Sequence, residues 1–192
     1  MEIVKRLDLF KEKGFKYASV GNIALLPIVK EKGFEIFADT GLNISNSHTL
    51  SLLEDYGTKY GVLSCELTLN EATKIKSKIP SGIIIYGNIP LMLFKNCPIK
   101  NGKDCKNCDK KGYITDRMGI NFPVRCRMGY SEMLNSVPIW LADRKNELDF
   151  DLGVLYFTSE TKERVREIIS AYKNCYSADI KHTRGLYYRG TT

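Results

Sequence analysis

Four short apolar runs alternate with helix-like segments in the first 87 residues, and this alternation limits the possible fold more than any other feature. The apolar runs predict strands at 17–20, 34–38, 60–64 and 83–87, and the segments beside them predict helices at 1–16, 23–32, 48–56 and 68–78. Short strands joined by helices form parallel sheets with right-handed crossovers. The unit length suits a (β/α) barrel, although a full barrel takes about 200 to 250 residues. The sequence therefore predicts an α/β fold that is either half of a barrel or an open sheet in need of a partner.

The second half of the chain has a weaker pattern. We expect a hairpin across Met118-Gly119, a turn or short helix at 131–135, strands at 137–141 and 152–157, and a helix at 161–173. We expect one compact domain over 1–192, with a partial TIM-barrel-like fold. Its β/α units occupy 1–94, a four-cysteine insert occupies 95–127, and a C-terminal strand, helix and basic tail occupy 128–192.

Four of the six cysteines share one polar, lysine-rich stretch. They are Cys97, Cys105, Cys108 and Cys126, in the spacing C-x7-C-x2-C-x17-C. A C-x2-C pair places two sulfurs on one tight turn, and two further cysteines complete a four-thiolate shell. A loop this polar has too little apolar surface to order itself, whereas a metal centre supplies that order. The spacing predicts a metal or cluster site, with zinc and an iron–sulfur cluster both open and with free or redox-active thiols as the alternative.

Composition and charge limit the function classes. Hydrophobic residues make up 43% of the chain, which favours a folded protein over a disordered one. No apolar run reaches the roughly 18 residues of a membrane span, and we expect no membrane association. The N-terminus lacks a signal peptide, and we expect a cytoplasmic protein in which disulfides are rare. The net charge of +7 fits a nucleic-acid or anionic partner, and it fits a merely basic soluble protein equally well.

The carboxyl ends of the predicted parallel strands hold the candidate site residues, because such ends carry the chemistry of parallel α/β folds. Glu66 is a candidate acid, base or substrate-binding carboxylate, or a helix-entry residue that complements the helix dipole. Asn43 and Asn46 are candidates for hydrogen bonds to a substrate, or for turn and capping roles. Tyr86 either faces the barrel mouth or packs in the core.

Motifs of hydrolytic enzymes are not visible in the sequence. His48 and His182 lie in no recognisable ligand spacing, and we interpret both as ordinary residues. The sequence shows no H-E-x-x-H motif, no locally supported Ser-His-Asp or Cys-His arrangement and no phosphate-binding glycine loop. The chain therefore lacks the signature of a standard protease.

Several motifs together resemble the peptidase U32, or collagenase-like, family over nearly the whole chain. They are LNISNS (42–47), LSCEL (63–67), YGNIPLM (86–92), NCPIK (96–100), TDRMGINFPV (115–124), LNSVPI (134–139) and HTRGLYYRG (182–190). The resemblance implies a TIM-barrel-like catalytic domain, of which this chain matches the C-terminal part. The first barrel strands are missing, which implies either a piece of a longer protein or a short natural form.

The same resemblance implies a function. Several members of the family are oxygen-independent or prephenate-dependent hydroxylation factors that act on tRNA wobble uridine, ribosomal RNA or a ubiquinone precursor ring, and they carry a four-cysteine [4Fe–4S] cluster. By resemblance, Cys97, Cys105, Cys108 and Cys126 are the cluster ligands. Cys65 stands where the family's S-x-E-L motif commonly has proline, and we interpret it, like Cys175, as a buried thiol.

Three hypotheses result. The first is an iron–sulfur-dependent hydroxylation factor for an RNA base or a similar planar substrate. Its anion-binding groups near the cluster would be Arg117, Arg125 and Arg127, and its contacts to tRNA or rRNA would be Arg184, Tyr187, Tyr188 and Arg189. The second is a peptidase that depends on Glu66. The third is a zinc-stabilised, non-catalytic fragment that pairs through an exposed sheet edge with a second chain or with the missing N-terminal barrel half.

Overall fold

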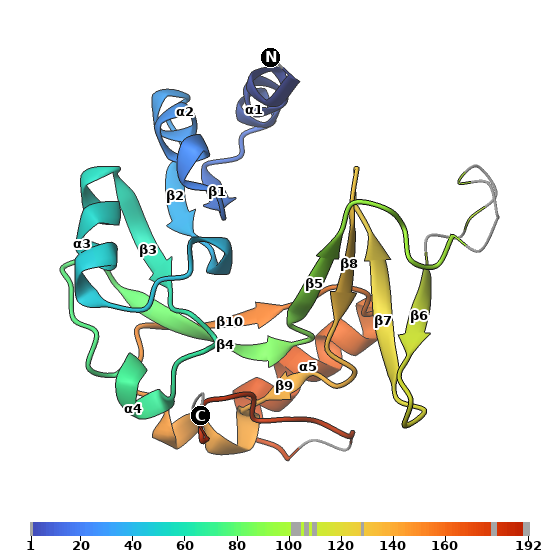
Figure 1. Ribbon diagram of the computed structural model, residues 1–192. Coiled ribbons are helices and arrows are strands. Elements are labelled where there is room, and N and C mark those ends of the chain that lie inside the picture. Colours follow the sequence, from blue (N-terminus) through green and yellow to red (C-terminus); the bar gives the residue numbers. More distant parts are fainter. Residues whose placement is uncertain are drawn as a thin grey trace. The chain divides into compact units, whose positions relative to one another are not determined.

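The structure, a computed structural model, describes residues 2–100, 105, 108, 111–127, 129–177 and 180–189 (Figure 1). The chain forms two compact units. The first takes Met1–Ile85, Arg144–Leu155 and Arg184–Thr192, and the second takes Tyr86–Asp143 and Tyr156–Thr183. These units interleave along the chain and do not follow the predicted segments 1–94, 95–127 and 128–192, so the single-domain organisation stays a prediction.

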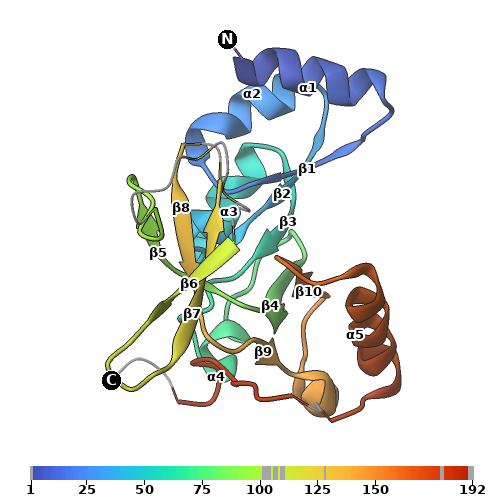
Figure 2. The same ribbon diagram turned by 90° about the vertical axis from the view of Figure 1, so that its right-hand side faces the viewer.

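A parallel sheet forms the centre of the first unit. Its strands run in the order β1 (Tyr17–Val20), β2 (Glu35–Ala38), β3 (Thr58–Val62) and β4 (Ser81–Gly87), and β10 (Leu152–Tyr156) follows β4. Figure 2 shows β1, β2 and β3 side by side, and their pairings are parallel, as is that of β3 with β4. Sequential parallel strands in a curled sheet are compatible with part of a (β/α) barrel, which confirms the predicted fold class in its coarser form.

The helices of the first unit begin where local signals place them. They are α1 (Glu2–Glu12), the 3₁₀ segments η1 (Ile23–Leu25) and η2 (Thr40–Leu42), α2 (Leu26–Glu31), α3 (Ser47–Asp55) and α4 (Leu69–Ala72). Pro27 lies in the first turn of α2, so this helix begins late, as a proline with no N–H requires. The α4 helix has a capping box between Thr68 and Glu71, yet it ends at Ala72, well before the predicted end at 78.

One face of the parallel sheet carries the core of the first unit. Ile36 and Ala38 of β2 are fully buried, as is Leu50 of α3. The alternate residues of these strands point to the other face of the sheet, which is only partly covered. Tyr17 on this face is 57% exposed. Its ring meets that of Phe37 edge-on at 5.7 Å, and Phe37 stacks on Tyr60 at 4.5 Å. Aromatic rings therefore line the face that would be the interior of a closed barrel.

A four-stranded antiparallel sheet dominates the second unit. Its order is β5 (Pro90–Phe94), β8 (Ser131–Leu134), β7 (Asn121–Cys126) and β6 (Lys111–Thr115). The β6–β7 hairpin confirms the prediction: Asp116 Oδ1 accepts hydrogen bonds from the N–H groups of Met118 and Ile120 at 2.8 and 2.9 Å. The predicted turn or helix at 131–135 is wrong, because this segment is β8, which pairs with both β5 and β7.

The remaining elements are short apart from one helix. They are β9 (Ile139–Trp140), which pairs with the end of β4, the 3₁₀ segment η4 (Ala142–Glu147), and α5 (Lys162–Asn174). Thr161 caps α5 by accepting a hydrogen bond from the N–H of Arg164 at 3.2 Å. Within the described ranges, no helix is both long and apolar enough to cross a membrane.

Substitution of Gly82 by alanine should destabilise the first unit strongly. A Cβ at this position of β4 would lie 2.5 and 2.7 Å from Cγ and Cδ1 of Leu152, and closer still to the Leu152 carbonyl oxygen. Because backbone must shift, we expect Gly82→Ala to cost about 3 kcal/mol in urea unfolding. Gly21→Ala is the control, since its nearest new contact is an ordinary 3.5 Å. Equal stability of the two variants would contradict this packing.

Candidate metal centre

Cys126 lies at the end of the antiparallel sheet where β5 ends and β6 begins, and the other three candidate cysteines lie between β5 and β6 in the sequence. Phe94, the last residue of β5, pairs with Ser131, and Ser131 pairs with Cys126, the last residue of β7. In the next row, Arg125 pairs with Lys111, the first residue of β6. The chain from β5 to β6 therefore leaves and re-enters the sheet at the end where Cys126 lies. We call the end of the sheet that is formed by the row of Phe94, Ser131 and Cys126 the cysteine end.

Packing brings the segment after Cys97 onto the face of the sheet that Cys126 shares. Gly112 pairs with Val124, and Cys126 lies two residues further along the same strand, so Val124 and Cys126 share a face. A Cβ at Gly112 would lie 2.7 Å from Cδ1 of Ile99. Ile99 follows Cys97 by two residues, so the connection folds back over β6 on the face of Cys126.

The thiol donors suit a four-thiolate centre in kind. All six cysteines lie within the described part of the chain, and none forms a disulfide. Cys97 and Cys108 are half-buried, while Cys105 and Cys126 are exposed. Among the described residues, no three His, Cys, Asp or Glu side chains meet around one point, and the loop positions 101–104, 106–107 and 109–110 lie outside the description. The ligand role of the four cysteines stays a prediction.

An ion cluster lies at the same end of the sheet. Glu132 Oε2 accepts hydrogen bonds from Arg125 Nη2 at 2.6 Å and Nε at 2.9 Å, and from Arg127 Nε at 3.2 Å. The Arg125 Nη2 group also donates to the Tyr156 hydroxyl at 3.3 Å. Because Glu132 pairs with Arg125 across the ladder and Arg127 is two residues further on, these three side chains share the face opposite Cys126.

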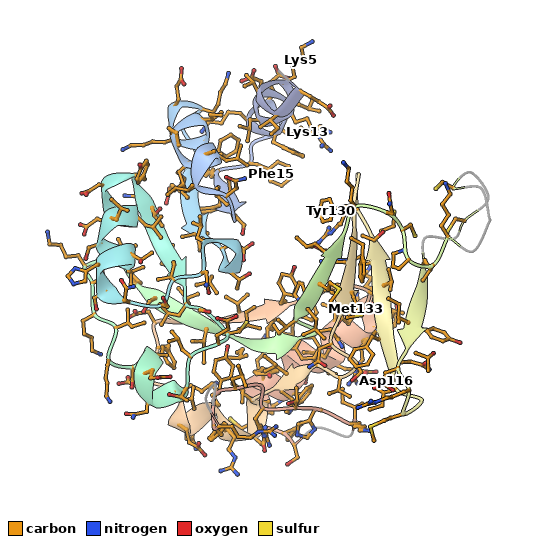
Figure 3. All side chains as sticks on the ribbon, in the orientation of Figure 1. Lys5, Lys13, Phe15, Asp116, Tyr130 and Met133 are labelled. Atoms are coloured by element: carbon orange, nitrogen blue, oxygen red, sulfur yellow. The ribbon has the colours of Figure 1, made fainter. Side chains whose placement is uncertain are left out.

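Arg117 lies at the other end of this sheet. It is exposed in the β6–β7 turn, beyond the pair Thr115–Asn121, which lies four ladder rows, or about 13 Å along the strands, from the pair Lys111–Arg125. Figure 3 marks the two ends by Tyr130, beside Arg127, and Asp116, beside Arg117. The structure therefore groups Arg125 with Arg127 but separates Arg117 from them, contrary to the expectation that all three lie near one cluster.

Two asparagines predicted to bind substrate have structural roles in the first unit. Asn46 caps α3, and its Oδ1 accepts hydrogen bonds from the N–H and hydroxyl of Thr49 at 2.8 and 3.1 Å. Asn43 follows η2 in the left-handed region at φ 47°, where asparagine is among the favoured residues. Both side chains are exposed, so a substrate role stays a prediction beside these local ones.

Glu66 is exposed just beyond the carboxyl end of β3. Its N–H donates to Ser64 Oγ at 3.3 Å, and no described residue forms a hydrogen bond or ion pair with its carboxylate. It does not enter α4, whose capping carboxylate is Glu71. The capping role in α4 therefore belongs to Glu71, and Glu66 stays a candidate as an accessible carboxylate near the strand end.

Tyr86 packs in the core of the second unit. It is 3% exposed, and its ring lies 5.9 Å from Trp140 and 5.5 Å from Phe157. Its hydroxyl donates to Glu160 Oε1 at 2.9 Å. Burial, and then the bond to Glu160, raise the pKa of Tyr86, so the phenol stays protonated. Of the two predicted roles, the structure supports packing.

The C-terminal tail is anchored in the first unit. Tyr187 is 2% exposed, and its hydroxyl donates to the Ile84 carbonyl at 2.8 Å. Tyr187 therefore offers no ring to stack on RNA, and this part of the prediction is wrong. The Tyr188 hydroxyl donates to Glu147 Oε2 at 2.7 Å, and burial raises the pKa of Tyr188 to about 12, with help from that bond. The hydrogen bonds from Tyr188 and Arg144 lower the pKa of the Glu147 carboxyl, and the charge of the half-buried Arg184 lowers it further.

Tyr187 should make the first unit sensitive to alkali. Burial raises the pKa of this phenol, whereas an unfolded phenol ionises near pH 10. Its contribution to stability is therefore full below about pH 10 and is lost as the pH rises further. We expect urea unfolding at about pH 8 and about pH 11 to show a smaller loss of stability for Tyr187→Phe than for the wild type. Tyr113→Phe, on exposed β6, is the control. An unchanged loss in Tyr187→Phe would contradict this assignment.

The other sulfur and imidazole groups lie apart from the four cysteines in the sequence. Cys65 is half-buried, where a buried thiol was predicted, and this partial burial raises the pKa of its thiol. Cys175 is exposed in the left-handed cap that ends α5, so its predicted burial is wrong. His182 Nδ1 hydrogen-bonds with the Ile180 carbonyl oxygen at 2.9 Å. Within the described ranges, neither histidine is hydrogen-bonded to a serine, cysteine or carboxylate side chain.

The fold and the candidate site define an α/β protein with a curled parallel sheet and a cysteine-bearing antiparallel sheet. The sequence model described as Peptidase family U32 matches residues 1–113, more than half of the chain, and the protein belongs to this family. The match spans the parallel strands β1 to β4, β5 and three of the four candidate cysteines, and it ends before Cys126. Comparisons with curated proteins and with solved structures gave no match.

Proposed function

We propose that this protein holds a [4Fe–4S] cluster on Cys97, Cys105, Cys108 and Cys126 and takes part in the hydroxylation of an RNA base or a similar planar substrate. The observation that supports the proposal is the strand register: Cys126 ends β7 at the end of the sheet where β5 ends and β6 begins, and Cys97, Cys105 and Cys108 lie between β5 and β6 in the sequence. Thiolates are the ligands that such clusters prefer. The membership of the U32 family and the resemblance of its motifs to hydroxylation factors add support. Zinc is the alternative occupant, because it accepts the same four donors.

Residues of the two units would perform three separate tasks. When bound, the cluster supplies one-electron chemistry at its site. The chain's own contribution would be to hold the four thiols at the cysteine end, with the positive charge of Arg125 and Arg127 at the same end but on the opposite face of the sheet. Glu66, with an accessible carboxylate, would accept or donate a proton in the first unit. The exposed Asn43 and Asn46 and the basic tail with Arg184 would contact a tRNA or rRNA substrate.

Mass spectrometry of RNA nucleosides tests the proposed reaction. We expect RNA from cells that lack the gene to lose a nucleoside that is heavier than its parent by one oxygen atom. The wild-type gene should restore it, and a gene encoding Cys105→Ala and Cys108→Ala should not. Identical nucleosides in all strains would contradict an RNA substrate.

A peptidase activity is the second candidate, and the family's description favours it. The carboxylate that such an activity would use is Glu66. Degradation of gelatin by the purified protein, lost on Glu66→Gln and on chelation of metal, would support it. No degradation after metal reconstitution would exclude it.

A partner that completes the barrel is a further part of the proposal. β1 is an edge of the parallel sheet, and an open parallel edge can pair with another strand. The partner would be a second chain or an N-terminal barrel half.

A further inference from the structure

Arg127 presents hydrogen-bond donors that no described residue accepts. Its Nε donates to Glu132 at 3.2 Å, and its two terminal nitrogens have no partner among the described residues. The side chain is 42% exposed. A guanidinium is a rigid fork, so fixing Nε also fixes the direction of the terminal Nη1–Nη2 edge. That edge has the geometry for bidentate contact with two oxygens of one anion.

Glu132 positions the Nη1–Nη2 edge of Arg127 but does not cancel the combined positive charge of Arg125 and Arg127. Its side chain is only 10% exposed, and it accepts from both arginines through one oxygen. Arg125 uses its donors within the protein. It donates two hydrogen bonds to Glu132 and one to the Tyr156 hydroxyl, and its guanidinium lies 5.9 Å from the Tyr156 ring centre. One carboxylate against two guanidinium groups leaves an excess of one positive charge. This excess positive charge lies beside Arg127, which is the arginine of this pair with accessible terminal N–H groups.

The chain beyond Arg127 is open to solvent at Gly129. The Arg127 N–H donates to the Tyr130 carbonyl oxygen at 2.8 Å, which closes the β7–β8 hairpin. Gly129 in this turn has φ 87°, and a Cβ built on it meets nothing within 4 Å. Access of an anion to Arg127 rests on the 42% exposure of its side chain.

We infer that Arg127, held by Glu132 and backed by Arg125, is a binding site for an oxyanion, either a carboxylate or a phosphate. The site lies on the face of the antiparallel sheet opposite Cys126, so it needs no cluster and goes beyond the proposed reaction. A carboxylate of a small metabolite and a phosphate of an RNA backbone share the chemistry that this edge recognises.

Isothermal titration calorimetry with malonate, inorganic phosphate and a short oligouridylate tests the inference. We expect the wild type to bind at least one of them, and Arg127→Gln to bind it about tenfold more weakly or worse. Arg117→Gln is the matched control, because it removes an exposed arginine at the other end of the same sheet and should bind like the wild type. Arg127→Lys keeps the charge but loses the fork, so its affinity should lie between those of Arg127→Gln and the wild type.

The three probes also distinguish the source of the anion. Tightest binding of oligouridylate indicates an RNA phosphate, and tightest binding of malonate indicates a small carboxylate. Fluorescence of Trp140, the single tryptophan, reports whether the second unit of each variant is folded. Failure of the wild type to bind all three probes, or equal losses in Arg127→Gln and Arg117→Gln, would overturn the site.

Discussion

Substitution of Glu132 by alanine is expected to lower the free energy of unfolding of the second unit by about 3 to 5 kcal/mol. The Glu132 side chain is 10% exposed and its partner Arg125 is 16% exposed, so the ion pair is largely shielded from water. Removing the carboxylate leaves Arg125 without its charged partner in a place where water cannot replace it. The loss is therefore much larger than that of a surface ion pair, which is about 0 to 1 kcal/mol.

Denaturation followed by Trp140 fluorescence measures this effect, because Trp140 is buried in the second unit. Glu167→Ala is the matched control. It also removes a glutamate bonded to an arginine at 2.8 Å, but the Glu167 side chain is 62% exposed on α5. We expect the control to lose less than about 1 kcal/mol. Similar losses in the two variants would show that the Glu132 cluster is solvated and would weaken the inferred oxyanion site as well.

Replacement of Tyr187 by alanine is expected to cost the first unit about 3 to 5 kcal/mol. The substitution empties the space of a ring that is 2% exposed. It also removes the donor that satisfies the Ile84 carbonyl of β4 at 2.8 Å. An unsatisfied buried carbonyl adds its own penalty of about 1 to 3 kcal/mol unless water enters the cavity.

The neighbouring residue provides the control. Tyr188 is 44% exposed and bonds to Glu147, so Tyr188→Ala should cost about 1 kcal/mol. Urea unfolding by circular dichroism, with amide hydrogen exchange of β4 as a local probe, compares the two variants. Faster exchange in β4 is expected for Tyr187→Ala alone. Equal stability of both variants would contradict the anchoring of the tail.

Local signals were sufficient to predict the parallel part of the fold. Each apolar run of the first 87 residues became a parallel strand within two residues of its predicted start, because a short apolar run between helices has few other ways to be buried. Pro27 and Asn46 mark the starts of α2 and α3 through single-residue chemistry that needs no tertiary partner. The α4 helix ends early although its capping box is present, so its length was not encoded in that local signal.

Features that depend on pairing partners could not be read from the sequence. β5 and β8 are short, and they are strands because each lies beside the other in the ladder. Arg117 and Arg127 are ten positions apart and look alike in the sequence, but the hairpin places them at opposite ends of one sheet. Tyr187 and Tyr188 are adjacent and chemically equal, yet only one is buried. The sequence analysis did not identify Glu132, and the available signal was a single carboxylate a few residues after Arg125 and Arg127.

The four cysteines combine a feature that the sequence predicts with one that depends on strand pairing. Their spacing in the sequence predicts a shared site, and the strand register places Cys126 at the end of the sheet where β5 ends and β6 begins. The register is compatible with the shared site that the spacing predicts, and both zinc and an iron–sulfur cluster accept four thiolates.

A visible absorption spectrum with iron, sulfide and zinc analysis of anaerobically purified protein tests the central proposal most directly. The samples are the wild type, a variant with both Cys105→Ala and Cys108→Ala, and Cys175→Ser as a control at an exposed cysteine outside the proposed ligands. We expect a brown wild type and control with about four irons per chain, and a colourless double variant without iron. A colourless wild type with about one zinc, or a double variant that keeps its iron, would contradict a [4Fe–4S] centre on these four cysteines.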